Sequence, residues 1–335
     1  MDGFKPDAPH TLARTLDYRI YRYWVTEGRY KPHRHQAILQ CLHDSSITYA
    51  LSRFIEGRNV VGIMGGHDIA RDSASFSLVS VLARSLTQKG FLVASGGGPG
   101  LMEAAHFGSL LAAESDSKFY SAQKTLAAES IFPTDAGIVV DEHGLVNEAV
   151  LSKLAEWIVA AMEVRQSVSA PCESLGIPTW RYGHEPTTVF ATHIAKYFEN
   201  SVREDGLLSI ASSGIIYAQG GAGTFQEVFQ SAVYNAYSDI DRGPSPMVFL
   251  GTDFWERSGA LSVLRGVFGQ ESFNRYVTCT DDLAEIVRVL LTFADANLNR
   301  SQHSIKRVSR SLPVLGIANQ SSEDEFGRFI DINVR

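Results

Sequence analysis

Three apolar segments of this chain run directly into clusters of glycines, and a helix-forming stretch follows each cluster. The segments span residues 59–66, 91–100 and 214–223. A buried strand that ends in a glycine turn and continues into a helix is the repeating unit of a parallel α/β sheet. Right-handed crossovers would bring the three turns to one edge of that sheet. We therefore predict an α/β fold with a Rossmann-like, doubly wound parallel sheet and helices on both faces.

The 335-residue chain divides into parts of different character. Residues 1–57 mix aromatic and charged side chains, and we expect an N-terminal helical extension with one helix near 35–56. Residues 58–297 carry the expected Rossmann-like nucleotide-binding domain, which a mostly helical insertion interrupts at about 112–172. Residues 298–335 are rich in Ser, Asn and charge. We expect a polar C-terminal tail there, loosely attached or packed on a partner subunit.

Apolar runs alternate with stretches whose apolar residues recur at helical spacing, and this alternation predicts the strands and helices of the domain. Strands are expected at 59–66, 91–95, 176–182, 214–219, 246–250 and 275–279. Helices are expected near 73–89, 101–105, 188–204, 224–236, 254–267 and 281–294. Within the insertion, an amphipathic run covers 147–165. Its apolar stripe is more typical of helix core or a dimer face than of a cofactor site: Leu151, Leu154, Trp157, Ile158 and Ala161.

Composition narrows the classes of function. The formal net charge is -7 and no block of Lys or Arg stands out, which disfavours binding to extended nucleic acid. The three cysteines, Cys41, Cys172 and Cys279, are scattered without disulfide or metal-ligand spacing, as expected in a reducing cytoplasm. No apolar run reaches membrane-spanning length, and residues 1–6 lack the apolar region of a signal peptide. We expect a soluble, cytoplasmic protein without a membrane partner.

The third glycine turn carries the most specific chemistry, in the sequence Gly-Gly-Ala-Gly-Thr-Phe-Gln-Glu at 220–227. Glycines free backbone N–H groups to face a ligand, and the positive end of the following helix dipole points at the same place. We therefore expect Gly220, Gly221, Gly223 and Thr224 to hold a phosphate group. The alternative is a tight turn whose glycines serve close helix–strand packing.

The other two glycine turns are candidates for the same ligand edge. Gly97, Gly98, Gly100 and Met102 belong to the second turn, Gly-Gly-Gly-Pro-Gly-Leu-Met at 96–102, and we expect it beside the nucleotide. Gly65 and Gly66 belong to the first turn, where His67 and Asp68 are equally consistent with ligand contact and with an ordinary polar turn. Neither the dinucleotide fingerprint nor the P-loop pattern is present, so a monophosphate fits better than NAD or a triphosphate.

Glu227 lies three residues after Thr224, in the first turn of the expected helix. One interpretation is a carboxylate that complements the helix dipole or caps the helix. Beside a phosphate loop, the same carboxylate could engage a ribose and stabilise a cationic sugar. Cleavage of an N-glycosidic bond passes through an oxocarbenium-like state, which a nearby carboxylate favours while it helps to orient water.

The motifs at 96–102 and 220–227 resemble those of the Lonely Guy (LOG) family, formerly labelled lysine decarboxylase-like. Members of that family are Rossmann-like homodimers or assemblies of dimers. They hydrolyse nucleoside 5'-monophosphates to free base and ribose 5-phosphate. The resemblance covers roughly 59–110 and 176–292, and it implies a homodimer or a dimer-based oligomer.

The resemblance also implies a catalytic pair. Glu227 matches the glutamate of the family pattern Pro-Gly-Gly-x-Gly-Thr-x-x-Glu, although Gln219 stands where the family has proline. The family's second residue is an arginine on the preceding helix, in a segment like Met-His-x-Arg-Lys. Arg203 is the arginine at nearly that distance, and Glu204 takes the lysine position. The alternative for Arg203 is a solvated helix arginine.

We therefore predict an enzyme, a hydrolase that cleaves the N-glycosidic bond of a nucleoside 5'-monophosphate. The predicted site needs no metal and no cofactor, since none of the histidines falls in a metal-ligand spacing. The alternative function is a non-catalytic carrier or sensor of a nucleotide or cofactor on the same fold, as in molybdenum-cofactor carrier proteins. Binding without turnover would distinguish that alternative.

Overall fold

The computed structural model describes residues 3–28, 32–182, 185, 188–237 and 244–311, the last stretch with side chains through 297. Contacts divide the chain into one compact unit up to Ala294 and a second from Asp295 onward. The first unit contains the whole sheet.

Seven strands form one sheet in which every neighbouring pair is parallel, in the order β4-β3-β2-β1-β5-β6-β7. The chain adds β2, β3 and β4 outward from β1 and then returns to place β5 on the other side of β1. The predicted doubly wound α/β fold is confirmed. The strands are β1 Val60–Met64, β2 Leu92–Ser95, β3 Ser174–Gly176, β4 His193–Ile194, β5 Ile215–Tyr217, β6 Met247–Phe249 and β7 Val277–Cys279.

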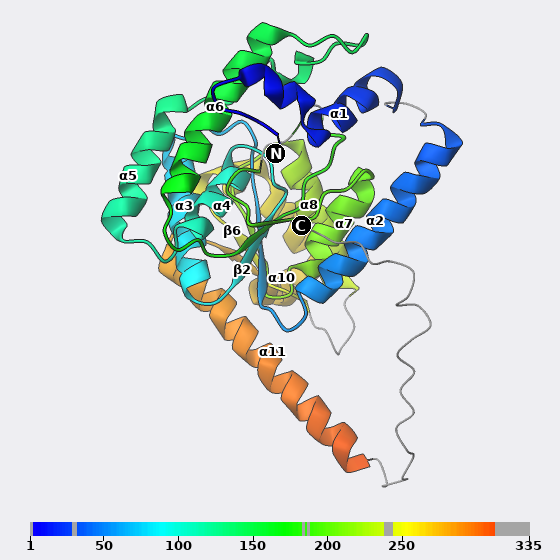
Figure 1. Ribbon diagram of the computed structural model, residues 1–335. Helices are drawn as coiled ribbons and strands as arrows, with labels where there is room; N and C mark the ends of the chain where they lie inside the picture. The colour runs from blue at the N-terminus through cyan, green and yellow to red at the C-terminus, as the bar shows by residue number, and fades with distance from the viewer. Residues whose placement is uncertain (1–2, 29–31, 183–184, 186–187, 238–243, 312–335) are drawn as a thin grey trace. The chain divides into compact units, whose positions relative to one another are not determined.

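Successive residues of β1, β2, β5 and β6 contribute to two separate cores, one on each face of the sheet. Val61 and Ile63 belong to one core, while Val60 and Met64 of the same strand belong to the other. Buried residues of α3, α4, α6 and the first turns of α11 line the first core; those of α7, α8, α9 and α10 line the second (Figure 1). This alternation is the two-residue period of a strand buried on both faces.

The helices are α1 Leu16–Tyr23, α2 Arg34–Phe54, α3 Ala74–Gln88, α4 Leu101–Leu110, α5 Asp116–Leu126, α6 Glu148–Ser167, α7 Asn200–Ile210, α8 Ala222–Ala236, α9 Thr252–Ser258, α10 Ala260–Tyr276 and α11 Leu283–Ser311. Ser73 caps α3 through its side chain, and Gly90 follows the end of α3 with φ +86°. The predicted start and stop of this helix are therefore correct.

The helix predicted near 188–204 is wrong. The chain instead forms the short strand β4 and begins α7 only at Asn200. β-branched residues at 188, 189, 192 and 194 favour the extended backbone there. The strand predicted at 176–182 ends at Gly176, because Pro178 has no N–H to donate to a ladder. Beyond it, pairing continues only as a bridge between Thr179 and Tyr197.

The helical region at 112–172 forms part of the crossover from β2 to β3. The apolar stripe on α6 is buried in the first core, as a core interpretation predicts: Leu151, Leu154, Trp157, Ile158 and Ala161. Arg71 joins α6 to α4, because its guanidinium pairs with buried Glu103 at 2.7 Å and lies 3.6 Å from the centre of the Trp157 ring.

Two terminal segments differ from expectation. The predicted helix near 35–56 exists as α2, but several of its apolar residues face outward: Ile38, Leu39, Leu42 and Tyr49. The last helix was expected to end at 294, yet α11 continues to Ser311, so the first part of the expected tail is helical. Residues 312–335, the rest of that tail, lie outside the described residues. Among the described helices, none combines the length and the apolar character that a membrane crossing requires.

Candidate functional site

The candidate site lies where the order of the sheet reverses, between β1 and β5. In an open parallel sheet, the loops after two such strands diverge and leave a place for a ligand. Here the loops touch at their base, where the Gly66 N–H donates to the Gln219 carbonyl at 2.9 Å. The Gln219 side chain donates to the Ser75 hydroxyl at 3.0 Å, in the first turn of α3. A proline at position 219 could not make that contact, so the glutamine ties the loop after β5 to α3.

The glycines of the 220–227 motif serve two different purposes. A Cβ at Gly220 would lie 2.2 Å from the Thr224 hydroxyl, so packing alone requires glycine there, and Thr224 is buried. A Cβ at Gly221 or Gly223 would meet nothing within 4 Å, and neither residue has a positive φ. Both are exposed at the start of α8. Packing therefore does not explain these two glycines, and their backbone is open to a ligand.

The second glycine turn is enclosed by protein. Residues 96–100 are all buried, and Gly97 and Gly100 adopt φ of +71° and +69°. A Cβ at Gly100 would lie 2.4 Å from the Gly66 carbonyl oxygen, and one at Gly98 would lie 2.6 Å from the Met102 side chain. Backbone conformation accounts for Gly97, and packing with backbone conformation accounts for Gly100, without a ligand; at Gly98 an added Cβ meets only the flexible end of the Met102 side chain.

Gly65 of the first turn has the same explanation, since an added Cβ would lie 2.9 Å from that of Leu101. Gly66 is buried against the loop after β5, and its added Cβ would come 2.9 Å from the Asp68 carboxylate. These two glycines therefore let the loops after β1, β2 and β5 approach one another. His67 and Asp68 are exposed beside them.

A buried serine–histidine pair lies beneath the second turn. The Ser95 hydroxyl is 2.8 Å from His106 Nε2, and His106 Nδ1 is 3.0 Å from the Ser174 hydroxyl. All three are inaccessible, and burial lowers the pKa of His106 to about 3, which keeps the ring neutral. Ser95 also accepts the Gly97 N–H at 3.2 Å. Together Ser95, His106 and Ser174 join β2, α4 and β3 and hold the turn in place.

Arg203 on α7 is buried at the centre of the site rather than solvated. Its Nε donates to the Ile177 carbonyl at 2.7 Å, and its Nη2 donates to the Gly96 carbonyl at 3.1 Å. These two carbonyls belong to the loops after β3 and β2. A Cβ at Gly96 would lie 2.0 Å from Arg203 Nη2, so glycine at 96 is what allows the guanidinium to enter. The solvated-arginine interpretation is therefore wrong.

Glu227 faces the free side of that guanidinium. Arg203 Nη1 lies 3.9 Å from Glu227 Oε1, and the Glu227 side chain is 13% exposed. Because α8 begins at Ala222, Glu227 lies in its second turn rather than the predicted first, which excludes the capping interpretation. Burial raises the pKa of Glu227 to about 7, while the Arg203 charge lowers it and the Glu204 charge raises it. The carboxyl group therefore titrates near neutral pH.

Two more residues belong to this cluster. Glu204 accepts from the side chains of Asn200 and Gln226, each at 2.7 Å, so it joins α7 to α8 beside the catalytic candidates. Tyr182 follows β3, and burial raises the pKa of its hydroxyl, with further effects from the charges of Arg203, Glu227 and Glu204. Sequence reasoning did not select Tyr182. The available signal was its position after a strand, at the ligand edge of the sheet.

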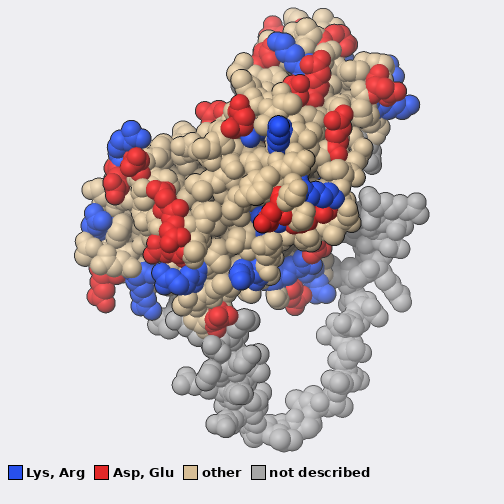
Figure 2. Space-filling model, turned by 90° about the vertical axis from the view of Figure 1, so that its left-hand side faces the viewer, with Lys and Arg blue, Asp and Glu red and all other residues tan. Residues whose placement is uncertain are grey.

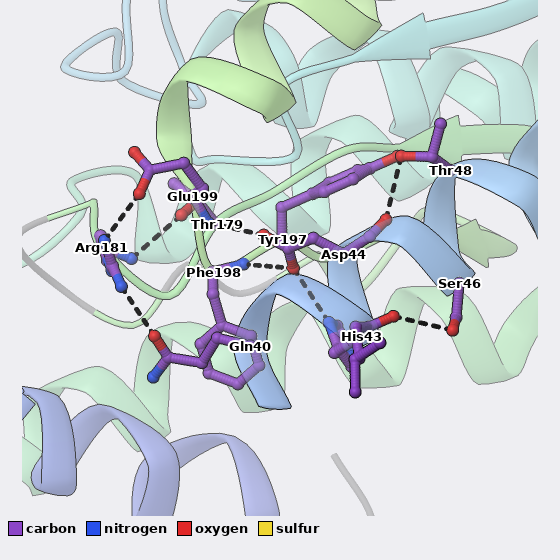
Figure 3. Close-up of polar contacts among 11 residues, drawn as sticks. Gln40, His43, Asp44, Ser46, Thr48, Thr179, Arg181, Tyr197, Phe198 and Glu199 are labelled. Atoms are coloured by element: carbon purple, nitrogen blue, oxygen red, sulfur yellow. Dashed lines mark hydrogen bonds and ion pairs between the residues drawn. The ribbon is translucent and has the colours of Figure 1, made fainter. Parts of the chain in front are cut away.

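The start of α7 is anchored by a residue of the N-terminal region. Asp44 reaches from α2 and accepts the N–H groups of Phe198 at 2.9 Å and Glu199 at 2.8 Å (Figure 3). Arg181 lies beside it, between Gln40 and Glu199. The Glu199 carbonyl in turn accepts the backbone N–H of Arg203. The N-terminal region thus fixes the helix that presents Arg203.

Removal of the Asp44 carboxylate should destabilise this anchor. Asp44 is buried, so Asp44→Ala leaves two backbone N–H groups without their acceptor and should lower the free energy of unfolding by about 2–3 kcal/mol. Ser46→Ala is the matched control on the same helix, because its hydroxyl bonds only to the local Leu42 carbonyl. It should change the free energy by less than about 0.5 kcal/mol. Urea denaturation measures both, and equal effects would contradict the anchoring role.

Comparisons with known proteins add little to this geometry. No family model matches the chain, and no curated protein matches it. A solved structure that resembles it is the molybdenum cofactor binding protein from the phototrophic bacterium Rippkaea orientalis. The identity is 12% and the TM-score 0.40, over 71% of this chain and 98% of that chain. Among the described residues, no group of three or more His, Cys, Asp or Glu is placed to hold a metal ion.

Proposed function

We propose that this protein is a nucleoside 5'-monophosphate N-glycosidase of the LOG type, which releases free base and ribose 5-phosphate. One observation carries the proposal. A buried arginine and a largely buried carboxyl group lie 3.9 Å apart, beside glycines whose backbone is open, at the switch point of a parallel sheet. A phosphate loop alone would suit any phosphorylated ligand, whereas the carboxyl group supplies what bond cleavage needs.

Each residue has a defined part in the reaction. The backbone at Gly221 and Gly223, at the positive end of α8, binds the 5'-phosphate. The Glu227 carboxylate stabilises the positive charge that develops on the ribose as the bond from C1' to the base nitrogen breaks. The base leaves with the bonding electrons and takes up a proton. Water adds its oxygen to C1' and gives up a proton. Arg203 favours the charged form of Glu227 and positions the loops around the substrate.

The test is incubation of the purified protein with AMP, GMP, CMP, UMP and cytokinin ribotides, with free base and ribose 5-phosphate measured by chromatography. At least one nucleotide should yield both products in equal amounts. Well-folded protein that binds a nucleotide but releases no base would support the carrier or sensor alternative. Protein that neither binds nor cleaves any of them would overturn both functions.

We also propose a cytoplasmic location and a homodimeric or dimer-based state for the protein. The three cysteines are free, which is consistent with a cytoplasmic protein. Exposed apolar side chains on α8, at its C-terminal end and on α10 suit a homodimer or a dimer-based oligomer, to be tested by sedimentation: Val233, Tyr237, Val263 and Val267. Acidic and basic residues are interspersed on the face in Figure 2, which gives no support to binding of extended nucleic acid.

The open glycines can be tested against the enclosed ones. Gly223→Ala adds a methyl group that meets no protein atom, so the fold should be unchanged or up to about 1 kcal/mol more stable. Its binding of ribose 5-phosphate should weaken about tenfold or more, because the methyl group occupies the phosphate position. Gly100→Ala is the contrast: its positive φ and the nearby Gly66 carbonyl should cost more than about 2 kcal/mol of stability. Calorimetric titration and urea denaturation measure these effects. Unchanged binding by Gly223→Ala would contradict the phosphate site.

The pH dependence of turnover follows from Glu227. Its ordinary carboxyl pKa of 4.5 is raised to about 7 by burial, so the folded protein holds the proton at pH 6 and releases it by pH 8. The charged form is the active one, hence kcat/KM should rise with pH to a plateau. We expect a midpoint near pH 7 and a loss of about tenfold per unit on the acid side. A flat profile between pH 5 and pH 9 would exclude this role.

A further inference from the structure

A separate cavity of about 330 Å³ lies near the ends of β3 and β4 and is not part of the proposed nucleotide site. Its walls come from residues 12–18, which lead into α1, from α6, from Pro178 after β3 and from residues in and around β4. Apolar side chains form much of the surface, including Leu12, Met162 and Val189. A cavity of this size falls at the small end of the range for small-molecule sites.

Two buried polar groups in this cavity have no hydrogen-bond partner among the described residues. They are the hydroxyl of Tyr18, which is 2% exposed, and Oε2 of Glu185, which is 3% exposed. Both residues line the cavity. Buried polar groups are nearly always paired, because an unpaired one loses its hydrogen bond to water without a replacement. Two such groups on the wall of one cavity therefore indicate a ligand that would pair with them.

The charges of the cavity wall are balanced. Lys196 Nζ contacts Glu185 Oε1 and also lies 2.9 Å from Asp17 Oδ1, so one cation bridges two carboxyl groups. Arg165 adds a second positive charge and donates to the carbonyls of Val189 and Ala191. Two acids and two bases disfavour a phosphorylated ligand, in contrast with the glycine loop before α8. Burial raises the pKa of Glu185 to about 7, which also suits an uncharged ligand.

We propose that this cavity binds a small uncharged heterocycle of nucleobase size, which presents an N–H donor and an acceptor to Glu185 and Tyr18. Glu185 Oε2 accepts the N–H, the Tyr18 hydroxyl donates to the ring acceptor, and the apolar wall covers the faces of the ring. The cavity also adjoins the loops that hold Arg203. Thr188 of its wall donates to the Gly97 carbonyl at 2.9 Å, next to Gly96. Pro178 of its wall follows Ile177 directly.

The test is calorimetric titration of the full chain with adenine, guanine, cytosine and uracil. At least one base should bind with one-to-one stoichiometry. Tyr18→Phe removes only a hydroxyl, so its fold should be at least as stable as the wild type while the affinity falls about tenfold. Glu185→Gln should likewise weaken binding or change which base is preferred. Tyr120→Phe, at an exposed tyrosine of α5, is the control and should change neither quantity.

Three results would overturn the proposal. They are no binding of any base at millimolar concentration, binding that Tyr18→Phe leaves unchanged, and a loss of stability in Tyr18→Phe that reveals a partner for the hydroxyl. In the second case, loss of binding in Gly223→Ala would place the base at the nucleotide site. None of these measurements depends on turnover, so failure here and failure of the glycosidase proposal are distinguishable.

Discussion

Glu227→Gln should lower kcat for nucleotide hydrolysis by about 10³-fold while binding of ribose 5-phosphate stays within about threefold of the wild type. Glutamine keeps the shape of the side chain but cannot carry the negative charge that stabilises the ribose cation. The phosphate is held by the backbone at Gly221 and Gly223, which the substitution does not touch. Initial-rate kinetics and calorimetric titration measure the two effects separately.

Glu204→Gln is the matched control for this substitution. Glu204 is the other carboxylate of the cluster, and it contacts Asn200 and Gln226 rather than Arg203. Its replacement should lower kcat by less than about tenfold, because it supplies no charge to the reacting ribose. Full turnover by Glu227→Gln, or equal losses in both variants, would remove Glu227 from the reaction.

The same Glu227→Gln variant should show that the native carboxylate destabilises the folded protein at high pH. The folded protein holds the Glu227 proton up to about pH 7, whereas the unfolded chain releases it near pH 4.5. The protonated Glu227 therefore contributes its full share to the free energy of unfolding below pH 4.5, and this contribution is lost as pH rises to 7. Above pH 7 the variant should be more stable by roughly 3 kcal/mol, and at pH 4 the two should be equal. Denaturation at pH 4 and pH 8 measures the difference.

The parallel sheet could be predicted from local sequence because three of its strands, β1, β2 and β5, are short apolar runs that end in glycine turns. The prediction failed for the segment between β3 and α7. Its apolar residues are spaced in a way that suits a helix, but the backbone pairs with β3 as β4 instead. Strand pairing depends on a neighbour distant in sequence, so local periodicity could not decide this choice.

The site could be predicted in part for the same reason. Glu227 and the open glycines form one continuous motif, so sequence placed them together. The role of Arg203 depends on carbonyls at Gly96 and Ile177, which only the folded sheet brings to it. Asp44 lies far away in the sequence and reaches the site solely through the packing of α2 against the start of α7. No local pattern marks such a contact.

Arg203→Met should affect both the reaction and the fold. Methionine keeps most of the side-chain length but leaves the carbonyls of Gly96 and Ile177 without a donor and Glu227 without a positive neighbour. Loss of one partner from a buried charged cluster costs about 3 kcal/mol or more of stability. The pKa of Glu227 should rise, because Arg203 is the group that lowers it. The midpoint of the pH–rate profile should therefore move upward by about one unit or more, with kcat/KM at pH 7 reduced about 10²-fold or more.

The shift in the midpoint separates an electrostatic role from a structural one. A merely loosened fold would lower the rate at every pH and leave the midpoint in place. Arg181→Met is the control, since Arg181 lies on the loop after β3, to which Arg203 donates, but pairs with Glu199 and Gln40 instead of Glu227. It should leave the midpoint where it is. The double variant Arg203→Met with Glu227→Gln should be more stable at pH 8 than Arg203→Met alone, because the uncompensated carboxylate is then gone. A double variant no more stable than the single one would show that Arg203 and Glu227 do not interact.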